Sequence, residues 1–124
     1  MERCYVKLVE GCDAMLDVMR KDYKDWSDRS NARRPDRVRD ENGETISDRM
    51  YREYCDSLEY KMGKKYIKVT DGSSVKAFVV ACDDDKKFAF GDILKPAGWK
   101  APARNFPRGN VISRSFGAVR WTGA

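Results

Sequence analysis

The segment from Lys95 to Asn110 combines side chains that bind anions with residues that stiffen a loop. It holds two aromatics, Trp99 and Phe106, among two lysines, two arginines and three prolines. No acidic side chain follows Asp92. The cations from there to the end of the sequence are Lys95, Lys100, Arg104, Arg108, Arg114 and Arg120. This one-sided charge predicts that the segment binds an anion.

The residue types in this loop favour a nucleotide-like anion. Trp99 offers a flat surface on which a base stacks with about 1 to 3 kcal/mol, and Arg108 can hold a phosphate through two parallel donors. The prolines fix φ, so a loop without regular hydrogen bonds loses less entropy when it is ordered. Two alternatives stay open, because Trp99 can anchor the loop on the fold and Asn110 can cap local backbone instead of contacting a ligand.

The chain contains no histidine, which removes the usual base of serine and cysteine hydrolysis. Binding without catalysis, and without a cofactor, is therefore the expected activity. The four cysteines lack metal-binding spacing and are predicted to be buried, reduced thiols; they are Cys4, Cys12, Cys55 and Cys82. The run Asp83-Asp84-Asp85 is predicted to form a tight turn, and no metal site is expected from it or from Asp92.

Two amphipathic helices are expected in the first half. Apolar residues recur at helical spacing from Tyr5 to Tyr23, and a second apolar stripe runs to Met62 after a cap at Thr45 or Ser47. Gly63 is expected to end that helix in left-handed geometry. The mixed charges of residues 27–43 predict a solvated loop, with a basic arm that folds over a ligand as the alternative.

The second half carries the alternation of β-strands. Strands are expected at 64–70 and 75–82, joined by a turn at Asp71-Gly72-Ser73-Ser74, with short ones at 88–90 and 93–95. Residues 111–114 and 118–121 are candidate edge strands. The sequence thus predicts one α+β domain over residues 1–124, with a helical part at 1–63 and an antiparallel sheet with a long, ordered basic loop at 64–124.

Composition agrees with a single compact domain that has a localised anion site. The chain has 124 residues, 41% of them hydrophobic, and a formal net charge of +5. Acidic residues outnumber basic ones before Tyr60, so the positive excess belongs to the second half. No signal peptide or membrane-crossing apolar run is recognised, and a cytosolic location is expected.

A resemblance sharpens these expectations. The stretch GDILKPAGWKAPA at 91–103, followed by Arg108-Gly109-Asn110, resembles small proteins encoded by bacteriophages, and Lys65-Tyr66-Ile67 with Ala77-Phe78-Val79 fits the same layout. Within that group the chain is similar to the first type of Thoeris anti-defence family. That resemblance implies α+β protomers, assembled as dimers or trimers of dimers, that capture cyclic ADP-ribose without cleaving it in the cytoplasm of the infected bacterium.

The resemblance also implies particular ligand contacts. The positions that match are Trp99, Lys100, Arg108, Asn110 and Arg114, and the helical half is expected to add Trp26 and Arg33. Members of the family are also thought to hold cyclic trinucleotides at a separate site, for which Arg108 and Arg114 are the candidates. The alternative function is a basic phage module that binds nucleic acid or inhibits a host nuclease.

Overall fold

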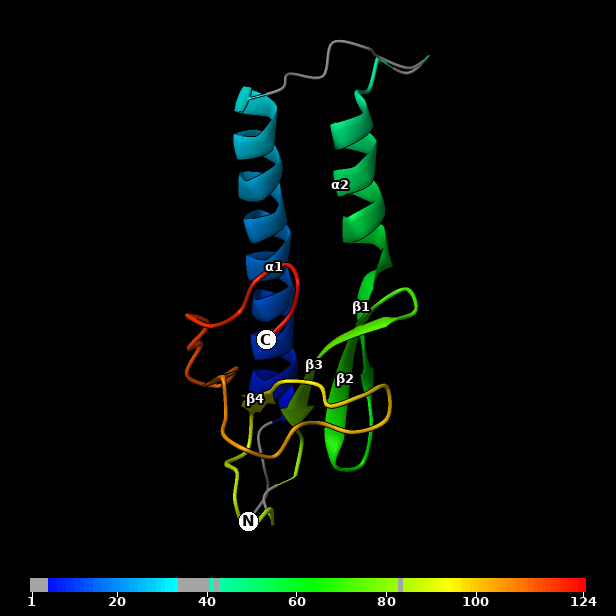
Figure 1. Ribbon diagram of the computed structural model, residues 1–124. Coiled ribbons are helices and arrows are strands. Elements are labelled where there is room, and N and C mark those ends of the chain that lie inside the picture. Colours follow the sequence, from blue (N-terminus) through cyan, green and yellow to red (C-terminus); the bar gives the residue numbers. More distant parts are fainter. Residues whose placement is uncertain (1–4, 34–40, 42, 83) are drawn as a thin grey trace.

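The computed structural model describes residues 5–33, 41, 43–82 and 84–124, and it has an α+β fold (Figure 1). Two helices, α1 (Tyr5–Arg33) and α2 (Ile46–Ser57), precede all the strands. The strands are β1 (Leu58–Met62), β2 (Tyr66–Asp71), β3 (Ser74–Val80), β4 (Asp92–Leu94) and β5 (Gly109–Asn110). They pair antiparallel in chain order, so the predicted fold class is confirmed.

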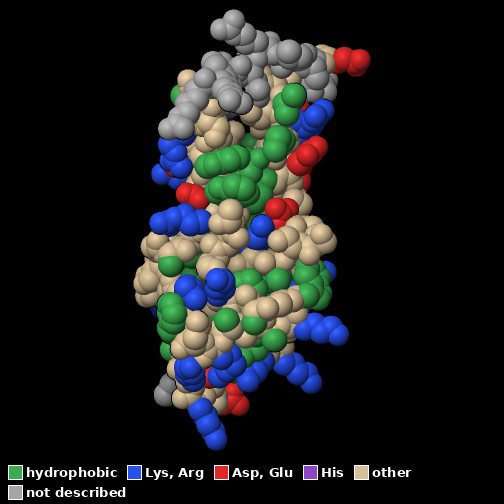
Figure 2. Space-filling view, in the orientation of Figure 1, with side chains coloured by type: hydrophobic (Ala, Val, Ile, Leu, Met, Phe, Trp, Pro, Cys, Tyr) green, Lys and Arg blue, Asp and Glu red, His purple; other side chains and the backbone are tan. Residues whose placement is uncertain are grey.

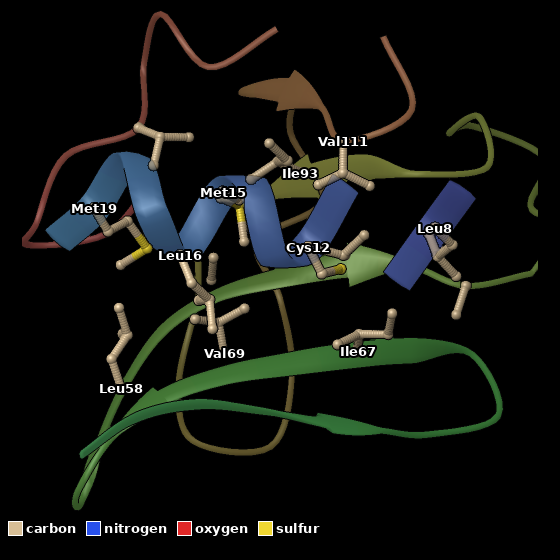
Figure 3. Close-up of a cluster of buried hydrophobic side chains, with 14 of the residues drawn as sticks. Leu8, Cys12, Met15, Leu16, Met19, Leu58, Ile67, Val69, Ile93 and Val111 are labelled. Atoms are coloured by element: carbon tan, nitrogen blue, oxygen red, sulfur yellow. The ribbon is translucent and has the colours of Figure 1, made fainter. Parts of the chain in front are cut away.

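The first half of α1 covers one face of the sheet. Its buried side chains recur every three or four residues and meet alternate residues of the strands, such as Ile67, Val69 and Ile93 (Figure 3). The helix contributes Leu8, Cys12, Met15, Leu16 and Met19, none more than 4% exposed. Removing these side chains from water is the main stabilisation of the sheet's covered face.

Gly11 explains how closely α1 approaches the end of the sheet. A side chain at this position would overlap the backbone carbonyl of Val111. Glycine lowers helix propensity by about 1 kcal/mol relative to alanine, and here it allows a contact that alanine would block.

The second half of α1 pairs with α2 around an aromatic cluster, defined as Tyr23, Trp26, Tyr51, Tyr54 and Trp121. Tyr23 stacks on Tyr54 at 4.6 Å between ring centroids and meets Trp121 edge-on at 5.0 Å. Tyr54 donates a hydrogen bond to the Trp121 carbonyl. The cluster ties the end of the chain to both helices.

The helix boundaries differ from the predicted ones. Helix α1 continues through residues 27–33, which were expected to form a loop, because Ser27 is buried and a Lys24–Asp28 ion pair of 3.0 Å spans one turn. Thr45 caps α2 as predicted, in a capping box with Asp48. The remaining predicted loop, at 34–40 and 42, lies outside the described residues.

Helix α2 also ends earlier than predicted, and residues 58–62 form β1 within the part expected to be helical. Leu58 has extended backbone and is buried against the core, while the Tyr60 hydroxyl donates to Asp13 of α1 at 2.9 Å. Pairing with β2 therefore overrides the helical spacing of the apolar residues. Gly63 does not act as a left-handed helix cap.

The β2–β3 hairpin is confirmed, with Gly72 at φ +60° in its turn. The predicted strand at 88–90 is wrong, since these residues form a bend and a turn in which Asp85 accepts the Phe88 N–H. Residues 111–114 form a turn after β5, and Arg120 and Gly123 form an isolated bridge in place of the last predicted strand. Among the described residues, no helix is both long and apolar enough to span a bilayer.

Candidate anion-binding site

Lysines gather on the face of the sheet that α1 leaves open. Strand alternation directs Ile67 and Val69 toward α1, so Lys68 and Tyr66 point to the other side. A hollow of about 350 Å³ lies there, lined by Lys61, Met62, Gly63, Lys64, Lys65, Tyr66, Lys68, Phe78 and Lys100. We call this surface the lysine face. In Figure 2, Lys and Arg side chains (blue) project from the lower part of the molecule, where Figure 1 shows β1 and β2.

The sheet register places two of these lysines directly opposite each other. Lys61 of β1 pairs with Lys68 of β2, and Lys68 in turn faces Phe78 of β3. Like charges on opposed positions of a sheet destabilise it. In the part of the chain that the structure describes, no acidic side chain lines the hollow, and Glu59, two residues before Lys61, stays exposed outside it. An anion bound here would relieve the repulsion.

Trp99 borders the lysine face through its contact with Lys68 and lies outside the core. The Lys68 ammonium is 4.3 Å from the centre of its ring and 5.9 Å from the Phe78 ring. Trp99 keeps 47% of its surface exposed. It belongs neither to the core beneath α1 nor to the smaller buried cluster of Phe78, Val80, Phe88 and Leu94 on the other face of the sheet. A flat aromatic beside an ammonium is an arrangement that binds a ring and a phosphate of one ligand.

A tight turn presents Trp99 and Lys100 to solvent. The Ala97 N–H donates to the Ala101 carbonyl at 3.0 Å, and Pro96 and Pro102 form an antiparallel bridge on either side of the turn. The segment predicted as a long basic loop is thus irregular apart from this bridge and strand β5 at its end, and its tip carries two of the predicted site residues.

Arg104 fastens the same loop to the rest of the fold. Its guanidinium makes two hydrogen bonds of 2.9 Å to Asp85 and one of 2.6 Å to the Tyr66 hydroxyl. The Asp85 side chain is 1% exposed and also accepts the N–H groups of Lys87 and Phe88. These bonds, led by the one from Arg104, hold the pKa of Asp85 well below its usual range. Arg104 is therefore a positioning residue for the loop.

The other predicted site residues have different surroundings. Lys100 lines the hollow, whereas Arg108 lies outside it with its guanidinium 4.0 Å from the centre of the Phe106 ring. The buried Arg108 Nε finds no hydrogen-bond partner among the described residues. Arg114 is exposed in the turn after β5 with φ +56°.

Asn110 is occupied by structural hydrogen bonds. Its amide group donates to the Phe90 carbonyl and to Asp92, and its side-chain oxygen accepts the N–H groups of Ile112 and Ser113. The geometry favours the capping role that the sequence left open.

The structure does not bring Trp26 to the lysine face. Trp26 lies in the aromatic cluster, 5.0 Å from Trp121, and is 41% exposed. Arg33 ends α1, and its side chain lies outside the described ones. Trp26 lines neither this hollow of 350 Å³ nor a second hollow of about 480 Å³ next to it.

The lysines of the β1–β2 hairpin were missed from sequence. Four lysines fall within residues 61–68, a local density that points to a cation cluster. The expected helix through Met62 separated Lys61 from Lys68, and only the hairpin register places them opposite each other.

The remaining reactive groups take structural roles. Cys12 is buried, and burial raises its pKa to about 12, whereas Cys55 and Cys82 are only partly buried, unlike the prediction. Cys4 lies outside the described residues. Asp92 accepts the Ala89 N–H, and the structure gathers no trio of potential metal ligands within its described ranges.

Comparison with known proteins gives one match. No curated protein and no solved structure matches the chain. A family model described as a family of unknown function, DUF7717, matches residues 1–124. Because the match extends over all 124 residues, the chain belongs to the DUF7717 family.

Proposed function

We propose that this protein binds a phosphate-bearing nucleotide ligand on the lysine face and releases it unchanged. The observation that carries the proposal is the opposed pair Lys61 and Lys68, of which Lys68 lies over the exposed ring of Trp99. A phosphate between the two ammonium groups replaces repulsion with attraction, and a base on Trp99 adds stacking. Both contributions appear only when one ligand carries both groups.

The first ligand that we propose is cyclic ADP-ribose, captured as a phage defence against bacterial immune signalling. The support is the resemblance of residues 91–103 to the Thoeris anti-defence family, together with Trp99 and Lys100 at the tip of that segment. Sequestration at nanomolar affinity requires about 12 kcal/mol of binding free energy. The lysine face is open to solvent, so a second protomer that covers the ligand would raise the affinity. The proposal therefore includes assembly as a dimer or trimer of dimers in the host cytoplasm.

Calorimetric titration with cyclic ADP-ribose tests this proposal. We expect saturable binding at fixed stoichiometry, a loss of at least about tenfold in Lys68→Ala, and unchanged binding in Lys21→Ala, a control lysine on the exposed side of α1. Chromatography of the ligand recovered by heating should return it intact. Absence of binding, or equal affinity in Lys68→Ala, contradicts the proposal, and a cleaved ligand contradicts the non-catalytic role.

A second candidate function is binding of single-stranded nucleic acid. It is favoured by the charge of residues 60–124, which hold thirteen lysines and arginines against five acidic residues. A basic surface with an exposed aromatic suits a strand whose bases stack and whose backbone follows the cations. Affinity for oligothymidylate should then fall steeply between about 50 and 200 mM salt. Salt-independent or undetectable binding contradicts this candidate.

A further inference from the structure

A second basic hollow adjoins the lysine face. It has a volume of about 480 Å³ and is lined by Lys64, Lys65, Cys82, Asp84, Asp85, Lys86 and Arg104. We call it the Lys86 hollow. Lys64 and Lys65 line both hollows, so the two form one continuous surface around the start of β2.

The boundary between the two hollows is rigidly built. Tyr66 lines the first hollow, and its hydroxyl accepts a hydrogen bond from Arg104, which lines the second. Arg104 is in turn held by the two oxygens of Asp85. The Tyr66–Arg104 contact therefore fixes the position of the two hollows relative to each other.

The charges of the Lys86 hollow favour an anion. Asp85 is compensated by Arg104 and by two backbone N–H groups, which leaves Asp84 as the opposing carboxylate among the described lining residues. Within the described residues, no ion pair joins Lys64, Lys65 or Lys86 to a carboxylate. Among the described residues that line the hollow, three lysines therefore face one aspartate that Arg104 does not hold.

We infer that the Lys86 hollow is a second phosphate site, and that the surface formed by both hollows takes a single-stranded oligonucleotide. This inference rests on the proposed binding of phosphate at the lysine face. Two hollows that share lysines suit one ligand with separated phosphates better than two independent ligands, because two bound anions would compete for Lys64 and Lys65. A phosphodiester chain carries its phosphates at regular intervals, whereas the two phosphates of cyclic ADP-ribose are adjacent and fit one hollow.

Oligothymidylates of one, two, four and eight nucleotides, titrated by fluorescence anisotropy or calorimetry, test the inference. Affinity for the wild-type protein should rise with length until both hollows are occupied. Lys86→Ala should lower the affinity for the eight-nucleotide strand by about tenfold and reduce the slope of that affinity against salt concentration by about 1. The affinity for the mononucleotide should fall less. Lys61→Ala should weaken every length, and Lys21→Ala should weaken none.

Asp84→Asn provides a test in the opposite direction. Removing the opposing carboxylate should raise affinity for the eight-nucleotide strand several-fold. The slope of its affinity against salt concentration should increase by about 1. A damaged fold cannot cause such a gain. If Lys86→Ala and Asp84→Asn leave every length unchanged while Lys61→Ala weakens binding, the inference is overturned and the proposed function stands. The inference is also overturned, and the proposed function stands, if the protein binds cyclic ADP-ribose but no oligothymidylate. If no probe binds, both fail.

Discussion

The two faces of the sheet are built from alternate residues of the same strands, yet they serve opposite purposes. Ile67, Val69 and Val79 point to α1 and are fully buried. Their neighbours Tyr66, Lys68 and Phe78 point to the other side, where loops cover only part of the surface. A period of two residues places the main core on one face of the sheet and, on the other, a charged surface beside a smaller buried cluster that contains Phe78 and Val80.

The comparison also separates stability from function. The covered face gains from burying apolar surface, at roughly 25 cal/mol per Å². The lysine face keeps two lysines at opposed positions of the sheet, and like charges placed in this way lower stability. Residues that oppose stability are typical of binding sites, because the ligand supplies what the fold lacks. Variants on the two faces should therefore behave in opposite ways.

The largest effect on folding is expected from the covered face. Met15→Ala leaves a cavity beneath α1, since Met15 is fully buried, and should lower the free energy of unfolding by about 2 to 5 kcal/mol. Lys61→Ala, on the other face, should change it by no more than about 0.5 kcal/mol. Urea denaturation followed by circular dichroism compares the two. Equal losses of unfolding free energy in the two variants would show that the two faces contribute equally to stability.

Trp99→Ala should produce the largest effect on binding without a comparable effect on folding. Loss of stacking should weaken a nucleotide ligand by about 1 to 3 kcal/mol, while the exposed ring contributes little to the core. Trp26→Ala is the matched control, because Trp26 is about as exposed but packs in the aromatic cluster. It should lower stability and spare affinity. If Trp26→Ala lowered affinity and Trp99→Ala did not, the ligand would bind near the helices and the site assigned to the lysine face would be wrong.

Removing the lysine repulsion should stabilise the protein slightly. Lys61→Thr replaces one of the opposed charges by a β-branched residue and should raise the free energy of unfolding by about 0.2 to 1 kcal/mol at low salt. The electrostatic part should shrink when salt screens the charges. Ligand affinity should fall in the same variant. A destabilised Lys61→Thr would mean that the two ammonium groups do not repel each other.

Asp85→Asn should act on the loop more than on the core, because the contacts of Asp85 hold the loop. It loses the charge that holds Arg104, so hydrogen exchange at residues 95–108 should speed up. The lowered pKa of Asp85 means that its contribution to stability is complete above its ordinary value of 3.8 and is lost as pH falls below it. The difference between wild type and variant should therefore vanish in acid. A difference that persists at low pH contradicts the ion pair as its cause.

Much of the architecture follows from the sequence because it depends on local periodicity. The apolar spacing of α1, the Thr45 cap and the Gly72 turn are local features, and the structure contains all three. The absence of acidic residues after Asp92 also predicts the basic character of the loop that carries Trp99. Whether that tryptophan anchors the fold or faces solvent is a matter of burial, and spacing cannot decide it.

Tertiary structure decided where local preferences conflict and which distant residues meet. Residues 58–62 fit a helix by apolar spacing but form β1, since strand pairing and contact with α1 outweigh propensity. That change of state is what places Lys61 opposite Lys68 and creates the lysine face. The sequence by itself therefore determined the fold class and the basic character of the second half. The position of the site depends on the strand register, which arises from contacts that no local pattern contains.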